Sequence, residues 1–256
     1  GSPDGAYPPC GEETIMGKIV SRAVNYGSLS PNEYDGNGNV FFGAGNVGTS
    51  GWHAKQLWNE PLPLEIAFAK MFGLPIPQPT IEASVGLKVH YRTGEDAVPT
   101  NSNGIVYNVD GGYQQDGVHN ASGTNEGRAS WNVDFSLFDK DGEFTNAYVW
   151  VDINPTIAKD YLKFQYDEDV DALVATDSNG NLRFLGTGNG PENVQQDSIN
   201  LMFFADLIDN DGNAGNGVQA WDMESGQFDF QIGLYDGNAV QTNVTVNVGP
   251  MLDAMM

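Results

Sequence analysis

The chain has 256 residues, with 11 Lys and Arg against 34 Asp and Glu, which gives a formal net charge of −23. Nucleic acids and anionic membranes bind proteins through Lys and Arg that replace their counterions, so this charge excludes both classes of partner. With 40% hydrophobic residues, including 13 Phe, 10 Tyr and 5 Trp, the chain can bury a large core, and disorder over its whole length is not expected.

Composition also indicates a structural class and a compartment. Gly supplies 32 positions, many of them in Asn-Gly or Asp-Gly pairs that provide the positive φ angles of tight hairpins. The single cysteine, Cys10, cannot form an internal disulfide, which fits a cytosolic protein or an exported bacterial protein that avoids thiols. No apolar run reaches the roughly 18 residues of a membrane span, so we expect no membrane insertion.

The N-terminal section is expected to be the least regular part of the chain. Residues 1–11, GSPDGAYPPCG, are rich in Pro and Gly and are predicted to form a flexible segment that opens on a cloning scar. In the residues that follow, Ile15, Ile19 and Val20 recur at helical spacing, which predicts a short helix, with a β-strand as the alternative. Residues 12–256 are predicted to form a single β-sandwich domain.

A helical insertion in that domain is predicted over about 62–74. Leu64–Phe72 holds good helix formers, Pro63 suits the first turn of a helix, and Gly73 followed by Pro75 ends the run. The segment is apolar almost all round. Two interpretations stay open: a helix that plugs the end of the sandwich, or a surface for self-association or for another surface protein.

After residue 79 the hydrophobic period changes to two. Single strands are predicted in ASVGLKVHYR (83–92), ASWNVDFSLFD (129–139) and AYVWVDI (147–153). Hairpins are predicted in ALVATDSNGNLRFLG (172–186), around Asn179-Gly180, and in FDFQIGLYDGNAVQTNVTVNVG (228–249). Strand, turn and strand at close spacing predict an all-β fold, an antiparallel β-sandwich of the jelly-roll-like or Ig-like kind, with one or two short N-terminal helices.

The stretch DLIDNDGNAGNGVQAWD (206–222) is the strongest candidate for a metal site. It is not an EF-hand, because Ala214 stands where that loop needs Gly and Ala220 where it needs a bidentate Glu. Calcium could still bind if the loop folds back on itself, and plain Asx turns are the alternative. The candidate calcium ligands are Asp206, Asp209, Asp211, Asn213 and Asp222. Residues 139–143 and 167–171 carry weaker versions of the signal, and a site assembled from two such loops stays open.

No catalytic motif supports an enzyme. The three histidines, His53, His90 and His119, share no metal-ligand spacing, and the chain has neither a G-x-S-x-G elbow nor a P-loop. Carboxylates are so abundant that no particular pair indicates a glycosidase. We therefore expect no enzymatic activity, and we name no catalytic residue.

A carbohydrate-binding module is the main rival to a structural role. Such modules stack sugars on exposed aromatic rings, although burial in the core is the usual fate of Trp in a sandwich. The candidate rings are Trp52, Trp58, Tyr113, Trp150 and Trp221. Tyr148 and Trp150 share one face of their predicted strand, opposite Val149 and Val151, so that face is a candidate for exposed rings.

Four groups of motifs follow one another in an order that indicates a family. They are NVFFGAGNVGTSGWHAKQ (39–56), IEASVGLKVHYRTG with NSNGIVYNVDGG (81–112), RASWNVDFSLF (128–138) and GQFDFQIGLYDGNAVQTNVTVNVG (226–249). This succession resembles a group of bacterial exported proteins that usually end in a PEP-CTERM-type sorting signal. The resemblance spans about 39–249, with an insertion near 57–79. It implies export and a β-sandwich, and it implies no established activity.

The sequence thus predicts a non-enzymatic protein at the cell surface or in the extracellular matrix of a bacterium, with a structural or adhesive role and with calcium as its candidate cofactor. Its partners would be further copies of itself or another surface protein. In the alternative, a carbohydrate-binding module, the partner is polysaccharide. A glycan-active enzyme is the third interpretation.

Overall fold

The computed structural model describes residues 18–26, 52–91, 105–110, 129, 131–154, 158–185, 193–204, 207, 226–234 and 240–249. Within those ranges the chain forms β-strands, one α-helix and one short 3-10 helix. The elements are β1 (Lys18–Tyr26), β2 (Trp52–Glu60), α1 (Pro63–Phe72), β3 (Thr80–Tyr91), β4 (Val106–Asp110), β5 (Trp131–Asp139), β6 (Tyr148–Asp152), β7 (Tyr161–Asp167), β8 (Ala172–Thr176), β9 (Leu182–Leu185), β10 (Val194–Ile199), η1 (Leu201–Phe204), β11 (Gly226–Leu234) and β12 (Val240–Gly249).

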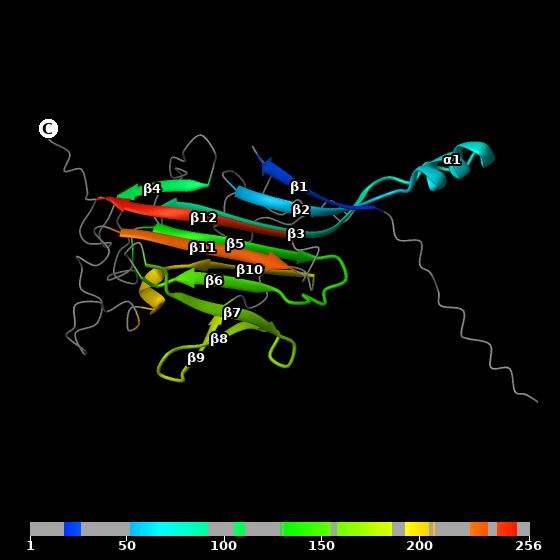
Figure 1. Cartoon of the computed structure of the whole chain (residues 1–256). Coiled ribbons are helices and arrows are strands. Elements are labelled where there is room, and N and C mark those ends of the chain that lie inside the picture. Colours follow the sequence, from blue (N-terminus) through cyan, green and yellow to red (C-terminus); the bar gives the residue numbers. More distant parts are fainter. Residues whose placement is uncertain are drawn as a thin grey trace, which may run out of the picture.

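The strands form two sheets, shown in Figure 1. A five-stranded sheet has the order β1-β2-β3-β5-β10, and a seven-stranded sheet has the order β4-β12-β11-β6-β7-β8-β9. The strands pair antiparallel except for β4, which runs parallel to β12. The all-β class predicted from the sequence is confirmed, and two stacked sheets are what a β-sandwich requires.

The core lies between the two sheets and draws its side chains from both. Trp131 on β5 is fully buried, and its ring centroid lies 6.0 Å from that of Phe228 and 6.3 Å from that of Phe230, both on β11. Aromatic pairs at these separations attract one another beyond the area that they bury. Every second residue of β12 from Val240 to Val248 faces the same core.

The period-two pattern predicted most of this core correctly. The inward positions expected for the last hairpin, Phe228, Phe230, Ile232 and Leu234, are all 0% exposed. The turn expected at Asn179-Gly180 joins β8 to β9, and Gly180 has a φ of 81°. That positive φ is the reason why glycine suits this position.

Of the two interpretations of the segment near the N-terminus, the β-strand is confirmed over residues 18–26 and the helix is wrong there. The helical spacing of Ile15, Ile19 and Val20 predicted a helix near the N-terminus, but residues 18–26 form strand β1, which pairs with β2 over its whole length. Isoleucine and valine favour strands, and a ladder with a neighbouring strand outweighs a short helical period. The second prediction, a helix over about 62–74, is confirmed as α1, bounded by Pro63 and Phe72.

Candidate functional site

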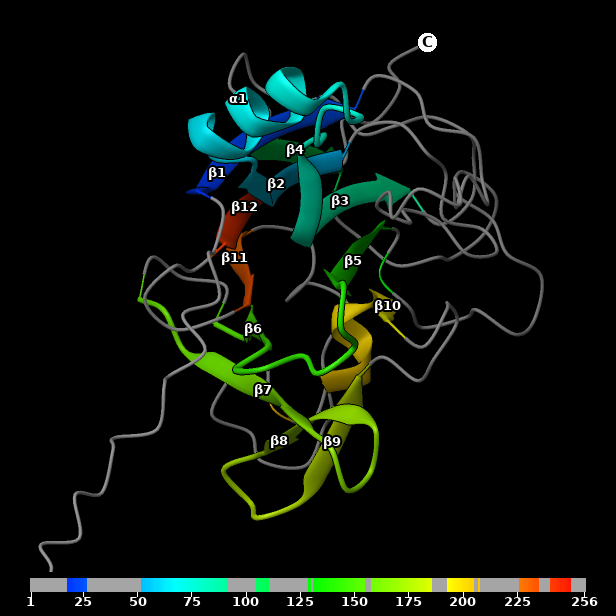
Figure 2. The same cartoon turned by 90° about the vertical axis from the view of Figure 1, so that its right-hand side faces the viewer.

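Helix α1 lies at the tip of an arm that projects from the two sheets. Strands β2 and β3 pair as far as Asn59 and Thr80, and the residues between them carry α1. Figure 1 shows α1 beyond the ends of the strands, and in Figure 2, which looks toward the tip of the arm, α1 stands in front of β1. We call residues 61–79 the arm. The interpretation of this helix as a plug at the end of the sandwich is therefore wrong.

The helix is held at both ends by its own residues. The backbone N–H of Leu62 donates to Glu65 Oε2 at 2.7 Å, which places a carboxylate at the positive end of the helix. Gly73 ends the helix with a φ of 64°, and Leu74 N–H donates back to the carbonyl of Ala69 at 2.8 Å. This is a Schellman ending, which requires the left-handed backbone that glycine adopts readily.

The apolar stripe of α1 faces solvent instead of the core. Leu64, Phe68, Met71 and Phe72 are spaced i, i+4, i+7 and i+8, which places them on one face of the helix. Their exposures are 76%, 54%, 76% and 60%, whereas the only buried residue of the helix is Ala69. Two further apolar side chains of the arm are exposed, Leu74 (51%) and Ile76 (44%). An apolar patch of this kind is typical of an interaction surface.

The candidate calcium ligands Asp206, Asp209, Asp211, Asn213 and Asp222 lie outside the described residues, as does Cys10. Within the ranges that the structure describes, no group of three or more His, Cys, Asp or Glu side chains could hold a metal ion.

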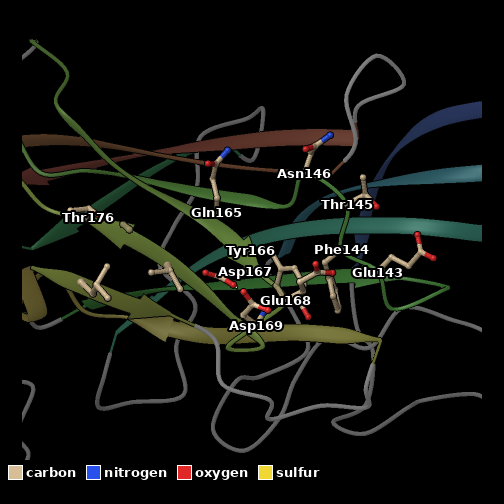
Figure 3. Close-up of a pocket in the computed structure, with 13 residues that line it drawn as sticks. Glu143, Phe144, Thr145, Asn146, Gln165, Tyr166, Asp167, Glu168, Asp169 and Thr176 are labelled. Atoms are coloured by element: carbon tan, nitrogen blue, oxygen red, sulfur yellow. The ribbon is translucent and has the colours of Figure 1, made fainter.

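The two weaker acidic stretches meet at a pocket between the turn after β5 and the β7–β8 turn, with a volume of about 660 Å³ (Figure 3). Among its lining residues are Glu143, Asp167, Glu168 and Asp169. In Figure 3 Asp167, Glu168 and Asp169 gather at the centre, whereas Glu143 extends away from them. Asp167 already accepts the backbone N–H of Asp169 at 3.0 Å. The sequence left a site built from two such loops open; the structure places residues of both loops at one pocket, but their carboxylates do not converge on one point.

The pKa of Tyr166, which lines this pocket, reflects its burial and the negative charge of the carboxylates around it. Tyr166 Oη donates to Asp171 Oδ1 at 2.8 Å. Burial, the bond to Asp171 and the nearby carboxylates of Glu168 and Asp167 raise the pKa of Tyr166 to about 12. Among the described residues that line the pocket there is no Lys or Arg, so this lining disfavours anionic ligands.

The candidate aromatic rings separate into three groups. Trp52 is buried at 3% exposure, as the core alternative predicted, and Trp58 is partly buried. Tyr113 and Trp221 lie outside the described residues. Trp150 is partly exposed on β6 beside Tyr148, with ring centroids 5.0 Å apart, so the two rings share one face as predicted.

The other face of β5 carries a buried polar cluster that sequence patterns did not indicate. Asp134 alternates with core residues and yet is 0% exposed, and it pairs across the sheet with Lys88, which is 5% exposed. His90 Nε2 lies 3.0 Å from Asp134 Oδ1, and His90 Nδ1 lies 2.8 Å from the carbonyl oxygen of Tyr91. Since both ring nitrogens face acceptors, only the protonated imidazole can donate to both.

The pKa values in this cluster follow from its burial and its charges. Burial by itself lowers the pKa of His90, but the hydrogen bond and charge of Asp134 outweigh burial and raise that pKa. Burial lowers the pKa of Lys88, and the charge of Asp134 opposes this only in part. The cluster is a buried ionic network, a type of feature that depends on which residues meet across strands and therefore has no local sequence signal.

No protein family, no curated protein and no solved structure matches this chain. None of the helices in the described ranges combines the length and the apolar character needed to cross a membrane.

Proposed function

We propose that the protein is a non-enzymatic structural or adhesive component exported to the surface or extracellular matrix of a bacterium, and that its copies associate through the apolar stripe of α1. The observation that carries the proposal is the exposure of Leu64, Phe68, Met71 and Phe72 on one face of a projecting helix. Export rests on the composition and on the family resemblance of residues 39–249.

The exposed apolar side chains of the arm, which are the stripe together with Leu74 and Ile76, are large enough to form an interface. Six apolar side chains of the arm are 44–76% exposed. At on the order of 100 Å² each, they offer roughly 600 Å² per copy, close to the roughly 800 Å² that each partner buries in a standard interface. In a two-fold pair each stripe meets its own counterpart, so one surface supplies both sides of the contact.

Charge favours a second copy as the occupant of the stripe. The arm contains one acidic residue, Glu65, and one basic residue, Lys70, so it is neutral in a chain of net charge −23. Two arms can therefore meet without bringing negative charge together, whereas contacts between other parts of the chain, which carry its net negative charge, are repulsive. A basic partner would be attracted to the rest of the chain and not to the arm.

The arm is also restrained before it binds. Its return segment contains Pro75, Pro77 and Pro79, and proline fixes the backbone φ near −65°. A restrained segment loses less conformational entropy on association, so more of the apolar contact energy remains as affinity.

Sedimentation velocity of the full chain, from about 1 to 100 μM, tests this proposal. We expect an oligomer that dissociates to monomer in the variant Phe68→Gln/Met71→Gln, in which Gln keeps the helix propensity high. Because both copies of a two-fold pair carry the two substitutions, four side chains at about 1–2 kcal/mol each would weaken association by about a thousandfold or more.

The matched control is Leu182→Thr/Phe184→Thr. These residues of β9 are exposed to a similar degree, 59% and 53%, and lie on the other sheet. The control should associate like the wild type. A wild type that stays monomeric at 100 μM, or a control that dissociates as far as the helix variant, would show that the stripe is not the contact.

A further inference from the structure

Three aromatic side chains form a row on the outer face of the seven-stranded sheet. Tyr148 and Trp150 alternate along β6 with the buried Val149 and Val151, and Tyr161 lies on the neighbouring strand β7. The centroids of the first two rings are 5.0 Å apart, and those of Trp150 and Tyr161 are 6.0 Å apart. All three residues are partly exposed, so this row, which we call the aromatic platform, belongs to the surface.

The platform is held in place from below and from the side. Tyr148 packs over Gly233 of β11, where an added Cβ would lie 2.6 Å from Tyr148 Cε1 and Cζ. Only glycine leaves room for the ring in this position. Tyr148 Oη donates to Gln241 Oε1 at 3.0 Å, and Tyr161 Oη accepts from Gln231 Nε2 at 3.0 Å. Rings that are fixed in advance lose little entropy when a ligand binds.

Amide side chains dominate the sheet face next to the rings. The outward positions of β11 and β12 include Gln227, Gln231, Gln241, Asn243, Thr245 and Asn247. Each amide offers both a donor and an acceptor, as a sugar hydroxyl does. Gln241 Nε2 and Gln231 Oε1 have no hydrogen-bond partner among the described residues. They border the rings and can bind hydroxyl groups there.

Two lysines offset two of the three aspartates beside the platform, and the third is Asp160. Lys159 Nζ lies 3.1 Å from Asp229 Oδ2 and 3.4 Å from Asp152 Oδ2. Lys163 Nζ lies 4.8 Å from the centroid of the Trp150 ring. Two lysines thus offset two aspartates on a chain whose net charge is −23. A neutral ligand is compatible with this surface, whereas a polyanion meets the field of the whole chain.

We propose that the aromatic platform binds a single chain of a neutral polysaccharide. A pyranose ring presents C–H groups on its face and hydroxyls at its rim, so its face suits the electron-rich face of an aromatic ring and its rim suits the amides. Successive rings of the platform are tilted by 39° and 48°. Because its rings are tilted relative to one another, the platform fits a single glycan chain whose sugars also turn along the chain. It does not fit the flat face of a crystalline polysaccharide.

Affinity electrophoresis of the full chain in native gels tests the proposal. The gels contain soluble neutral polysaccharides (hydroxyethyl cellulose, xylan, mannan and dextran), with alginate as the anionic probe. We expect at least one neutral polysaccharide to retard the protein, and Trp150→Ala to weaken that binding by about tenfold or more. Trp150→Tyr, which keeps an aromatic face, should restore most of it.

Gly233→Ala tests whether the position of the Tyr148 ring over Gly233 matters for binding, without changing any ring of the platform. The added methyl group displaces the Tyr148 ring, so binding should weaken while the melting temperature shows that the fold is kept. The matched control is Phe184→Ala, because Phe184 is a 53% exposed aromatic on β9 of the same sheet. It should bind like the wild type.

Each outcome decides the proposal. Retardation by a neutral polysaccharide that is lost in Trp150→Ala and kept in Phe184→Ala supports it. It is overturned by no retardation in any of these gels, by equal retardation of Trp150→Ala and wild type, or by retardation with alginate alone. The platform is separate from the arm. The variant Phe68→Gln/Met71→Gln should therefore bind short oligosaccharides of the retarding polysaccharide with the same affinity as the wild type.

Discussion

The packing of the two sheets against each other can be tested through one aromatic pair. Trp131 of the five-stranded sheet meets Phe230 of the seven-stranded sheet at a centroid distance of 6.3 Å with perpendicular rings, and both residues are fully buried. Replacing either residue by Leu keeps the site apolar but removes the ring contact. Each substitution should cost about 2 kcal/mol of unfolding free energy, within the usual range for single core changes.

The informative quantity is the coupling between the two substitutions. Urea unfolding of the wild type, both single variants and Trp131→Leu/Phe230→Leu should show a coupling energy of about 0.5–1.5 kcal/mol, as expected for aromatic pairs in contact. The control pairs Trp131→Leu with Phe144→Leu. Phe144 is also buried but follows the far end of β5, roughly 25 Å away at about 3.3 Å per strand residue. Additivity of the Trp131 and Phe230 effects within about 0.3–0.5 kcal/mol would refute the stacking of the sheets described above.

Two further predictions concern titration and calcium. Because the pKa of His90 is raised in the folded protein, its contribution to stability is complete below the ordinary histidine pKa and is lost as pH rises through the raised value. In Asp134→Asn, urea unfolding between about pH 5.5 and 8.5 should no longer show this loss of stability with rising pH. If NMR titration finds the same His90 pKa in this variant as in the wild type, Asp134 is not the group that raises it. Calcium added to chelator-stripped protein should raise the melting temperature through Asp206–Asp222, with a gain of about 2.7 kcal/mol at a hundredfold excess over Kd. Magnesium is the control, and no shift at millimolar calcium would leave those aspartates as turn residues.

The parts of the fold that depend on local pattern could be predicted from the sequence. Alternation along residues 228–234 and 240–248 identified the inward residues, because a sheet with one buried face allows only one register. Gly73 and Pro75 located the end of α1 for a similarly local reason. The helical spacing of Ile15 and Ile19 gave a wrong prediction. The residues of this segment alone do not show that strand β2 is available to pair with it.

The candidate sites depend on contacts between distant residues, which local patterns do not contain. The shared face of Tyr148 and Trp150 followed from alternation, but Tyr161 joins them only because β7 pairs with β6. The space under Tyr148 exists because Gly233 lies opposite it on β11. The arm illustrates the same limit. Its apolar residues were evident in the sequence, but their exposure follows from β2 and β3, which carry α1 beyond the sheets.

The arm and the aromatic platform occupy different parts of the molecule, and this separation gives them a joint consequence. The arm connects β2 and β3 of the five-stranded sheet, whereas the platform lies on the outer face of the seven-stranded sheet. If copies associate through their arms as proposed, they keep their platforms exposed, and one polysaccharide chain can meet more than one of them. When one platform is bound, the next meets the same chain at a high effective concentration, which can raise the overall affinity by about 10²–10⁴ without any new contact. On the proposed function, a platform of modest affinity is then sufficient for adhesion, because association through the arm would supply the strength that a single platform lacks.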